Sequence, residues 1–279
     1  MPAATAQALS RSTRRTRAAA DELTIVQWEH VVPGYDSWFN AWAESWGASR
    51  GVNVRVDHVE YTDLPRLAAA EAKAEKGHDI FGFLAPPAGY EDKVIDHADV
   101  VAEVERMVGP IGDHGRASTW NPRTGKYFGV SDGYAPAPLI WRHDLWNQVG
   151  ESPATWDHVL AAAPKLSALG HTIGIGLADE PDSTVALLGL MACFGSFLQD
   201  EGNHPTLGTK ATIEAVDTMK ELFAAGGDPR TLAWGVTSNN QSLLGGKAAL
   251  IVNAISATRT ADALGLPLAR ELWLWPLPR

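Results

Sequence analysis

The feature that most constrains this chain is an alternation of strand-like and helix-like segments that begins at Leu23. Residues 23–28 (LTIVQW) form an apolar run, and Val52, Val54 and Val56 alternate with polar residues. Both patterns are typical of β-strands. Strands separated by helix-length segments are joined by crossovers, so the pattern predicts a parallel sheet in an α/β domain.

A helix is expected between these two strands, opening near Asp36 and ending at Gly47 or Gly51. Residues three or four apart share one face of a helix. Tryptophan recurs at this spacing, and we expect the shared face to pack in the core: Trp38, Trp42 and Trp46.

The alternation continues to the end of the chain. A helix opened by Thr62 and a strand over residues 79–85 complete the first series. A second series follows, with strands at 127–131, 138–143, 172–178, 248–252 and 271–275, and with helices opened by Thr155 and over 182–199, 210–225 and 257–264. Ser256 is expected to cap the last helix. The segment ELWLW at residues 271–275 is apolar on both faces, which predicts a strand inside a sheet.

The charge of the chain excludes some partners. Its net charge is −10, although its first 20 residues contain four arginines and no acid. An acidic body repels phosphate backbones and anionic lipid, so we expect neither nucleic acid nor a membrane surface as partner. The longest apolar run, residues 185–194, is too short to span a bilayer.

The first 22 residues have two interpretations. Arg14 and Arg15 resemble the start of a twin-arginine export signal, and three alanines at 18–20 resemble a cleavage site. No apolar segment lies between them, so residues 1–22 are either a signal remnant or a disordered basic leader.

Catalytic and metal-binding motifs are scarce. The sequence has no G-x-S-x-G, H-E-x-x-H or P-loop motif, and its nine histidines include no pair spaced for zinc. We therefore expect no metal, no cofactor and no catalytic residues. Glu29 and His30 could form an acid/base pair, but hydrogen bonding to a neutral ligand is favoured because no nucleophile stands near them in the sequence.

Three stretches resemble the family 1 extracellular solute-binding proteins, the sugar receptors of ATP-driven importers. Residues 139–146 (LIWRHDLW) resemble the family's strand-to-helix segment, and residues 153–157 (PATWD) resemble its P-x-T-W-D/E helix opener. The third stretch begins at Trp234, contains GKAAL at 246–250 and ends at Asn253. The resemblance covers about Leu23 to Arg279.

The resemblance implies a two-lobed α/β fold of the periplasmic-binding-protein type II class, with a mostly parallel sheet in each lobe. Residues 23–129 and 253–279 would form lobe 1, and residues 130–252 lobe 2. Family members normally continue with further helices, so we expect this chain to be truncated at its C-terminus. The resemblance to this family further implies an extracytoplasmic monomer that carries a sugar or oligosaccharide to the permease subunits of an ABC importer.

A sugar presents hydroxyl groups and flat C–H faces, so its site requires hydrogen-bonding side chains and aromatic platforms. Tryptophan is unusually frequent, with 11 copies against 7 phenylalanines and 5 tyrosines. The resemblance implies where the family places its ligand contacts. Together with this chemistry, it selects the candidate ligand-binding residues: Trp28, Glu29, His30, Tyr35, Asp132, Tyr134, Phe194, Trp234, Asn239, Asn240 and Asn253. Two alternatives remain open, a carbohydrate-active α/β enzyme using Glu29 or Asp132 and a truncated remnant that binds nothing.

Overall fold

The computed structural model describes residues 22–200, 202 and 204–278, so the expected leader lies outside the described residues apart from Glu22. The described chain divides into two compact units. The N-terminal unit comprises residues 22–28 and 37–83, and the C-terminal unit comprises residues 29–36 and the chain from Leu84 onward. No helix in the described ranges is long and apolar enough to cross a membrane.

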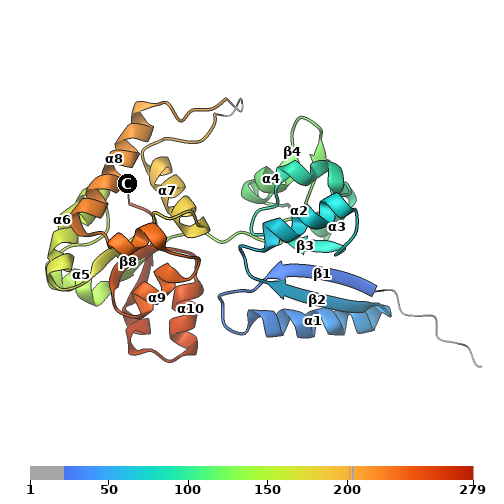
Figure 1. Cartoon of the computed structure of the whole chain (residues 1–279), viewed down its shortest axis with the longest axis horizontal. Coiled ribbons are helices and arrows are strands. Elements are labelled where there is room, and N and C mark those ends of the chain that lie inside the picture. The colour runs from blue at the N-terminus through green and yellow to red at the C-terminus, as the bar shows by residue number, and fades with distance from the viewer. Residues whose placement is uncertain (1–21, 201, 203, 279) are drawn as a thin grey trace, which may run out of the picture. The chain divides into compact units, whose positions relative to one another are not determined.

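The N-terminal unit contains a parallel three-stranded sheet in the order β2-β1-β3 (Figure 1). Strand β1 pairs with β2 from Glu22↔Asn53 to Trp28↔Val59. This arrangement confirms the predicted β-α-β-α-β series. Its elements are β1 (Glu22–Trp28), α1 (Tyr35–Arg50), β2 (Asn53–Val59), α2 (Leu64–Ala74) and β3 (Ile80–Gly82).

The tryptophan face of α1 does not pack in the core. The helix instead buries Ala43 and Gly47, whose small side chains allow close packing. A Cβ atom on Gly47 would lie 2.6 Å from the carbonyl oxygen of Val52. The tryptophans lie one position before this buried face, about 100° around the helix. The expectation of a buried tryptophan face was wrong, and the side chains are 59, 49 and 37% exposed: Trp38, Trp42 and Trp46.

The C-terminal unit is built on a mixed four-stranded sheet in the order β7-β8-β6-β9. Strands β7 and β8 run parallel, whereas β6 is antiparallel to both β8 and β9. Short strands β4 and β5 form a separate antiparallel pair. The elements are η1 (Ala88–Lys93), α3 (Ala98–Val108), α4 (Asp113–Thr119), β4 (Trp120–Asn121), β5 (Lys126–Tyr127), β6 (Leu139–Arg142), α5 (His143–Val149), α6 (Trp156–Ala168), β7 (Thr172–Gly174), α7 (Pro181–Cys193), α8 (Lys210–Gly226), η2 (Pro229–Ala233), α9 (Ser238–Leu244), β8 (Ala248–Val252), α10 (Ser256–Ala263), η3 (Pro267–Glu271) and β9 (Leu272–Trp275).

Both faces of this sheet are covered. On β6, Leu139 and Trp141 pack into a core cluster with residues of α5, α6, α7 and α8. Ile140, between them, points to the opposite face and packs with residues of α9 and α10. A strand buried on both faces must be apolar throughout. The continuous apolar runs at β6 and β8 therefore have a direct physical reason.

The end of the described chain belongs to this sheet. Strand β9 pairs with β6 from Leu139↔Trp275 to Arg142↔Leu272. Residues 253–279 were expected in lobe 1, with a lobe boundary at 129/130, whereas β9 shares a sheet with β6 and β8 and the two compact units divide near residue 84. The assignment of residues to lobes stays a prediction. Strand β9 also lies at the edge of the sheet, not inside it. Its residues Trp273, Leu274 and Trp275 are 45, 45 and 49% exposed.

Two predicted helix caps have different outcomes. Thr155 caps α6 as expected, because its hydroxyl accepts a hydrogen bond from the backbone N–H of His158 at 3.2 Å. Ser256 is not the cap of α10. The capping position is Ile255, and Ser256 is the first residue of the helix. The hydroxyl of Ser256 is used in a buried network described below.

Candidate ligand-binding site

Trp28 lies at the carboxyl edge of the N-terminal sheet, where the sequence places it. It is the last residue of β1, opposite Val59 at the end of β2. Its ring meets the ring of Tyr61 edge-on, with centroids 5.7 Å apart and an interplanar angle of 86°. Parallel strands place their carboxyl ends along one edge, which is where α/β proteins bind ligands. Trp28 is half-buried at this edge.

Three expected site residues and one further acid gather around Tyr35 in the C-terminal unit. We call these residues the Tyr35 cluster: the expected His30, Tyr35 and Asp132, and Asp36. The rings of His30 and Tyr35 lie 3.8 Å apart at 33°. The backbone N–H of His30 donates to both carboxylate oxygens of Asp36 at 3.3 Å, which fixes the loop before α1. The structure therefore brings His30 and Tyr35 together, and their role in ligand binding stays a prediction.

The negative charge of Asp132 acts on the phenol of Tyr35. Burial raises the pKa of Tyr35, and the negative charges of Asp132 and Asp36 raise it further. The phenol consequently stays protonated and can donate a hydrogen bond. The cluster combines an aromatic pair, a phenol donor and carboxylate acceptors, which are the groups that a polyhydroxylated ligand uses.

Two neighbouring candidates are more exposed. Glu29 is exposed on the loop before α1. Tyr134 is 72% exposed, and its ring centroid lies 5.5 Å from that of His114. Neither side chain is held in a buried pocket of the described chain. Their role in binding stays a prediction.

The three candidate asparagines are brought together, but they bond to one another. The Asn253 amide donates to Oδ1 of Asn240 at 2.5 Å, and the Asn240 amide donates to the Ser256 hydroxyl at 2.9 Å. The Asn239 amide donates to Oδ2 of Asp182 at 2.8 Å. All three asparagines are buried. We call these five residues the asparagine network, and it joins α9, α10, the end of β8 and the start of α7.

Asp182, which no sequence pattern singled out as a site residue, lies half-buried at one end of this network. It lies in the first turn of α7, after the capping residue Glu180 and Pro181. Burial raises the pKa of Asp182 to about 6, with the charge of Glu180 adding to the effect and the Asn239 amide opposing it. The cap-proline-acid order at a helix start was the available signal in the sequence.

Phe194 and Trp234 occupy structural positions. Phe194 follows the last turn of α7 and packs against the large core cluster while staying half-buried. Trp234 follows η2 and is also half-buried. No described contact assigns either ring to a ligand. Their role in binding stays a prediction.

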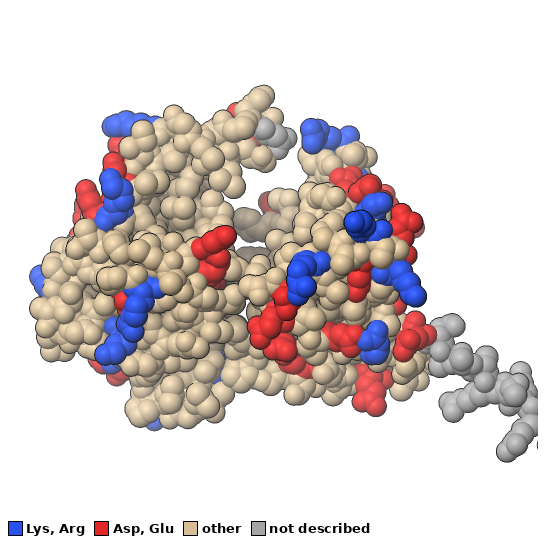
Figure 2. All heavy atoms as spheres, viewed as in Figure 1, with Lys and Arg blue, Asp and Glu red and all other residues tan. Residues whose placement is uncertain are grey.

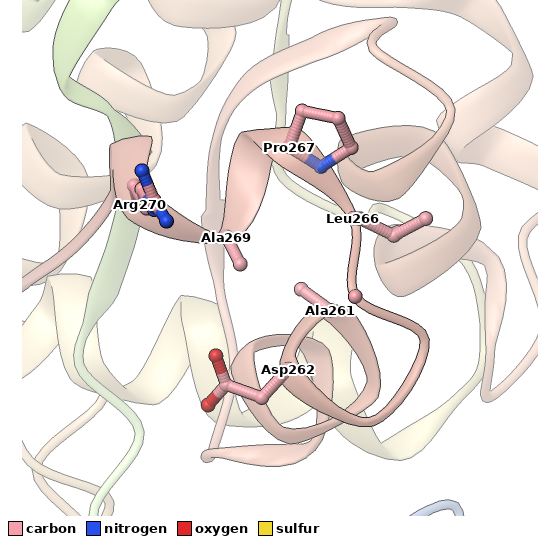
Figure 3. Close-up of a pocket in the computed structure, with 7 residues that line it drawn as sticks. Ala261, Asp262, Leu266, Pro267, Ala269 and Arg270 are labelled. Atoms are coloured by element: carbon pink, nitrogen blue, oxygen red, sulfur yellow. The ribbon is translucent and has the colours of Figure 1, made fainter.

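A groove of about 480 Å³ lies between α10 and η3, and none of these candidates lines it (Figure 3). Asp262 projects from the α10 side, and Arg270 lies on the η3 side. Its remaining walls are short or apolar: Ala261, Gly265, Leu266, Pro267 and Ala269. Within the described ranges, no group of three His, Cys, Asp or Glu residues is placed to hold a metal ion.

The surface carries both basic and acidic side chains (Figure 2), as expected for a chain with 23 Lys and Arg and 33 Asp and Glu residues. On the face seen in Figure 2, basic and acidic side chains are intermingled, and the lysines and arginines form no broad patch there. A protein that binds a phosphate backbone normally presents such a patch.

Comparison with solved structures shows the fold. The chain is 16% identical to a ribitol-bound ABC transporter solute-binding protein of Agrobacterium radiobacter K84, with a TM-score of 0.75, and the match covers 93% of this chain and 67% of that one. Maltose-bound MalE3 of T. maritima is also 16% identical, with a TM-score of 0.74 and coverages of 93% and 68%. A sugar transporter of Arthrobacter chlorophenolicus A6 with bound laminaribiose is 15% identical, with a TM-score of 0.73 and coverages of 91% and 65%.

These matches confirm the expected fold class, an α/β fold of the periplasmic-binding-protein type. This chain spans about two thirds of the length of those structures. No curated protein sequence matches it significantly. The family described as "Bacterial extracellular solute-binding protein" matches residues 41–276, which is most of the chain. The chain therefore belongs to the bacterial extracellular solute-binding proteins.

Proposed function

We propose that this protein is the carbohydrate receptor of an ATP-driven importer, that it works outside the cytoplasm, and that a membrane permease takes the sugar from it. The observation that carries the proposal is the Tyr35 cluster, in which two aromatic rings in contact lie beside carboxylates. The ribitol, maltose and laminaribiose bound by proteins of the same fold support the same ligand class.

Within this proposal, the tyrosine and Asp182 have different roles. The Tyr35 hydroxyl stays protonated and donates to a sugar oxygen, while the ring of Tyr35 or His30 contacts a C–H face. Asp182 uses the carboxylate oxygen not bonded to Asn239 to accept from a sugar hydroxyl. The role of Trp28, at the carboxyl edge of the N-terminal sheet, stays a prediction. No covalent step is proposed, and the sugar leaves unchanged.

Calorimetric titration of the full chain with maltose, laminaribiose and ribitol tests the proposal. We expect reversible binding of at least one of them, with the sugar recovered intact by chromatography. Tyr35→Phe keeps the ring and removes the hydroxyl, so it should weaken binding by about 1 kcal/mol, roughly fivefold. Tyr90→Phe, in η1, is the matched control and should bind as the wild type does.

Two results would contradict the proposal. Hydrolysis of a glycoside at enzymic rates would favour the carbohydrate-active enzyme. A folded chain that binds none of a broad sugar panel would favour a remnant without ligand. Size-exclusion chromatography with light scattering tests the accompanying proposal that the protein is a monomer.

A further inference from the structure

His78 of the N-terminal unit lies between two carboxylates. Its Nδ1 is 2.8 Å from Oε1 of Glu71 in α2, and its Nε2 is 2.9 Å from Oδ2 of Asp57 in β2. Its backbone N–H also donates to the second carboxylate oxygen of Glu71 at 2.6 Å. The side chains of His78 and Glu71 are only 12 and 16% exposed, whereas that of Asp57 is 38% exposed.

The local backbone is shaped for this contact. Gly77 has a φ of +152°, and a Cβ atom there would lie 1.9 Å from a carboxylate oxygen of Glu71. Only glycine leaves room for the carboxylate to reach both the ring and the backbone of His78. The next residue, Asp79, accepts hydrogen bonds at 2.8 Å from the backbone N–H and from the hydroxyl of Thr24 in β1. The segment therefore ties α2, β2 and β1 together.

Hydrogen-bond chemistry fixes the charge state of the ring. A neutral imidazole has one N–H donor and one bare nitrogen, whereas an ionised carboxylate only accepts. A neutral His78 would therefore point a lone pair at one of its two carboxylates. An imidazolium donates to both of them, and charge-assisted hydrogen bonds of this kind are the stronger ones.

We propose that the folded N-terminal unit holds His78 as an imidazolium between Glu71 and Asp57, and that the unit loses stability as the solution becomes alkaline. Charged groups on each packed element contribute: Glu71 from α2, Asp57 and its ion-pair partner Arg55 from β2, and Asp79 before β3. The edge of the ring meets Phe81 of β3, with centroids 5.9 Å apart, which adds no charge.

The sign of the pH effect follows from these contacts. Burial alone would lower the pKa of His78, but the hydrogen bonds and charges of Asp57 and Glu71 outweigh it and raise the pKa. A group whose pKa is raised by folding stabilises the folded state below its unfolded pKa. That stabilisation is lost as the pH rises through the folded pKa. Each pKa unit of difference corresponds to a tenfold change in the folding equilibrium constant.

The first test is the protonation state of the ring in the full chain. Two-bond ¹H–¹⁵N correlation spectra of histidine-labelled protein should show both ring nitrogens of His78 protonated at pH 7. A bare ring nitrogen at pH 7 would overturn the proposal, including the case in which a carboxylate carries the proton instead. This measurement on the wild type does not depend on any variant folding.

The second test measures stability between pH 6 and pH 9. Urea unfolding is followed through the amide resonances of β1 and β2, which report on the N-terminal unit. The unfolding midpoint of the wild type should fall across this range, whereas that of Glu71→Gln should change much less. His58→Gln, on β2 beside the Asn40 amide, is the matched control and should keep the wild-type slope. Equal slopes for the wild type and Glu71→Gln would contradict the proposal.

Discussion

The side-chain amide of Asn239 donates a 2.8 Å hydrogen bond to Oδ2 of Asp182, which joins the first turn of α9 to the first turn of α7. The amide holds one carboxylate oxygen and leaves the other available. Burial and the charge of Glu180 nevertheless keep the pKa of Asp182 at about 6. A carboxyl group whose pKa is shifted by burial and by a neighbouring charge is typical of a functional site.

Replacing Asp182 with asparagine should stabilise the protein near pH 7. The folded pKa lies above the ordinary value of 3.8, so ionisation of Asp182 costs stability as the pH rises through about 6. Because the side chain is partly solvent-exposed, we expect a gain of only about 1 kcal/mol at pH 7.5 and none near pH 4.

Urea unfolding at both pH values measures this difference, and Asp92→Asn, in exposed η1, is the control that should show no pH-dependent gain. If Asp182 also accepts from a sugar hydroxyl, the same substitution should weaken binding in calorimetry. A variant that is destabilised at pH 7.5 would contradict the electrostatic assignment.

Two tryptophan substitutions should differ sharply in cost. Trp42 is 49% exposed, so Trp42→Ala should lower the free energy of unfolding by less than about 1 kcal/mol. Trp146 is fully buried, and its Nε1 donates to the carbonyl oxygen of Ala249 at 3.1 Å. Trp146→Ala should cost about 3–5 kcal/mol. Chemical denaturation checks both, and equal losses would mean that α1 buries its tryptophan face.

Gly47 should not tolerate even alanine. The new Cβ would lie 2.6 Å from the carbonyl oxygen of Val52 and 2.7 Å from Cγ2 of Val54. Alanine gains about 1 kcal/mol of helix propensity over glycine, but overpacking against the backbone costs about 1–3 kcal/mol. We expect a net loss of about 1 kcal/mol in thermal or urea unfolding. Ser45→Ala, on the exposed side of α1, should be neutral, and a stabilised Gly47→Ala would refute the close approach.

The N-cap of α6 offers a direct measure of capping. Thr155→Ala removes the hydroxyl that accepts from the backbone N–H of His158, so it should cost about 1 kcal/mol. Thr155→Ser keeps the acceptor and should retain most of the stability. If both variants lose the same stability, the methyl group rather than the hydroxyl of Thr155 is what matters at this position.

The residues expected at the ligand site differ in how well the sequence predicted their surroundings in the fold. His30 and Tyr35 were selected as polar or aromatic residues between the end of the first strand and the start of the following helix. The fold brings their rings together. The third stretch that resembles the family selected Asn239, Asn240 and Asn253, which the fold buries in hydrogen bonds to one another. Asp182 was missed because its raised pKa comes from burial and from the charge of Glu180, and because its hydrogen-bond partner Asn239 lies 57 residues away.

The sequence alone determined the β-α-β-α-β series of the N-terminal unit, its parallel sheet and the start of α6 at Thr155, because periodicity and capping act between near neighbours in the chain. Tertiary structure decided which face of α1 is buried, because Gly47 fits against Val52 and the bulky Trp42 does not. It also decided that β9 forms the edge of the C-terminal sheet, because pairing with β6 joins residues more than a hundred positions apart. Such contacts depend on shape and hydrogen bonding between distant segments, which no local pattern contains.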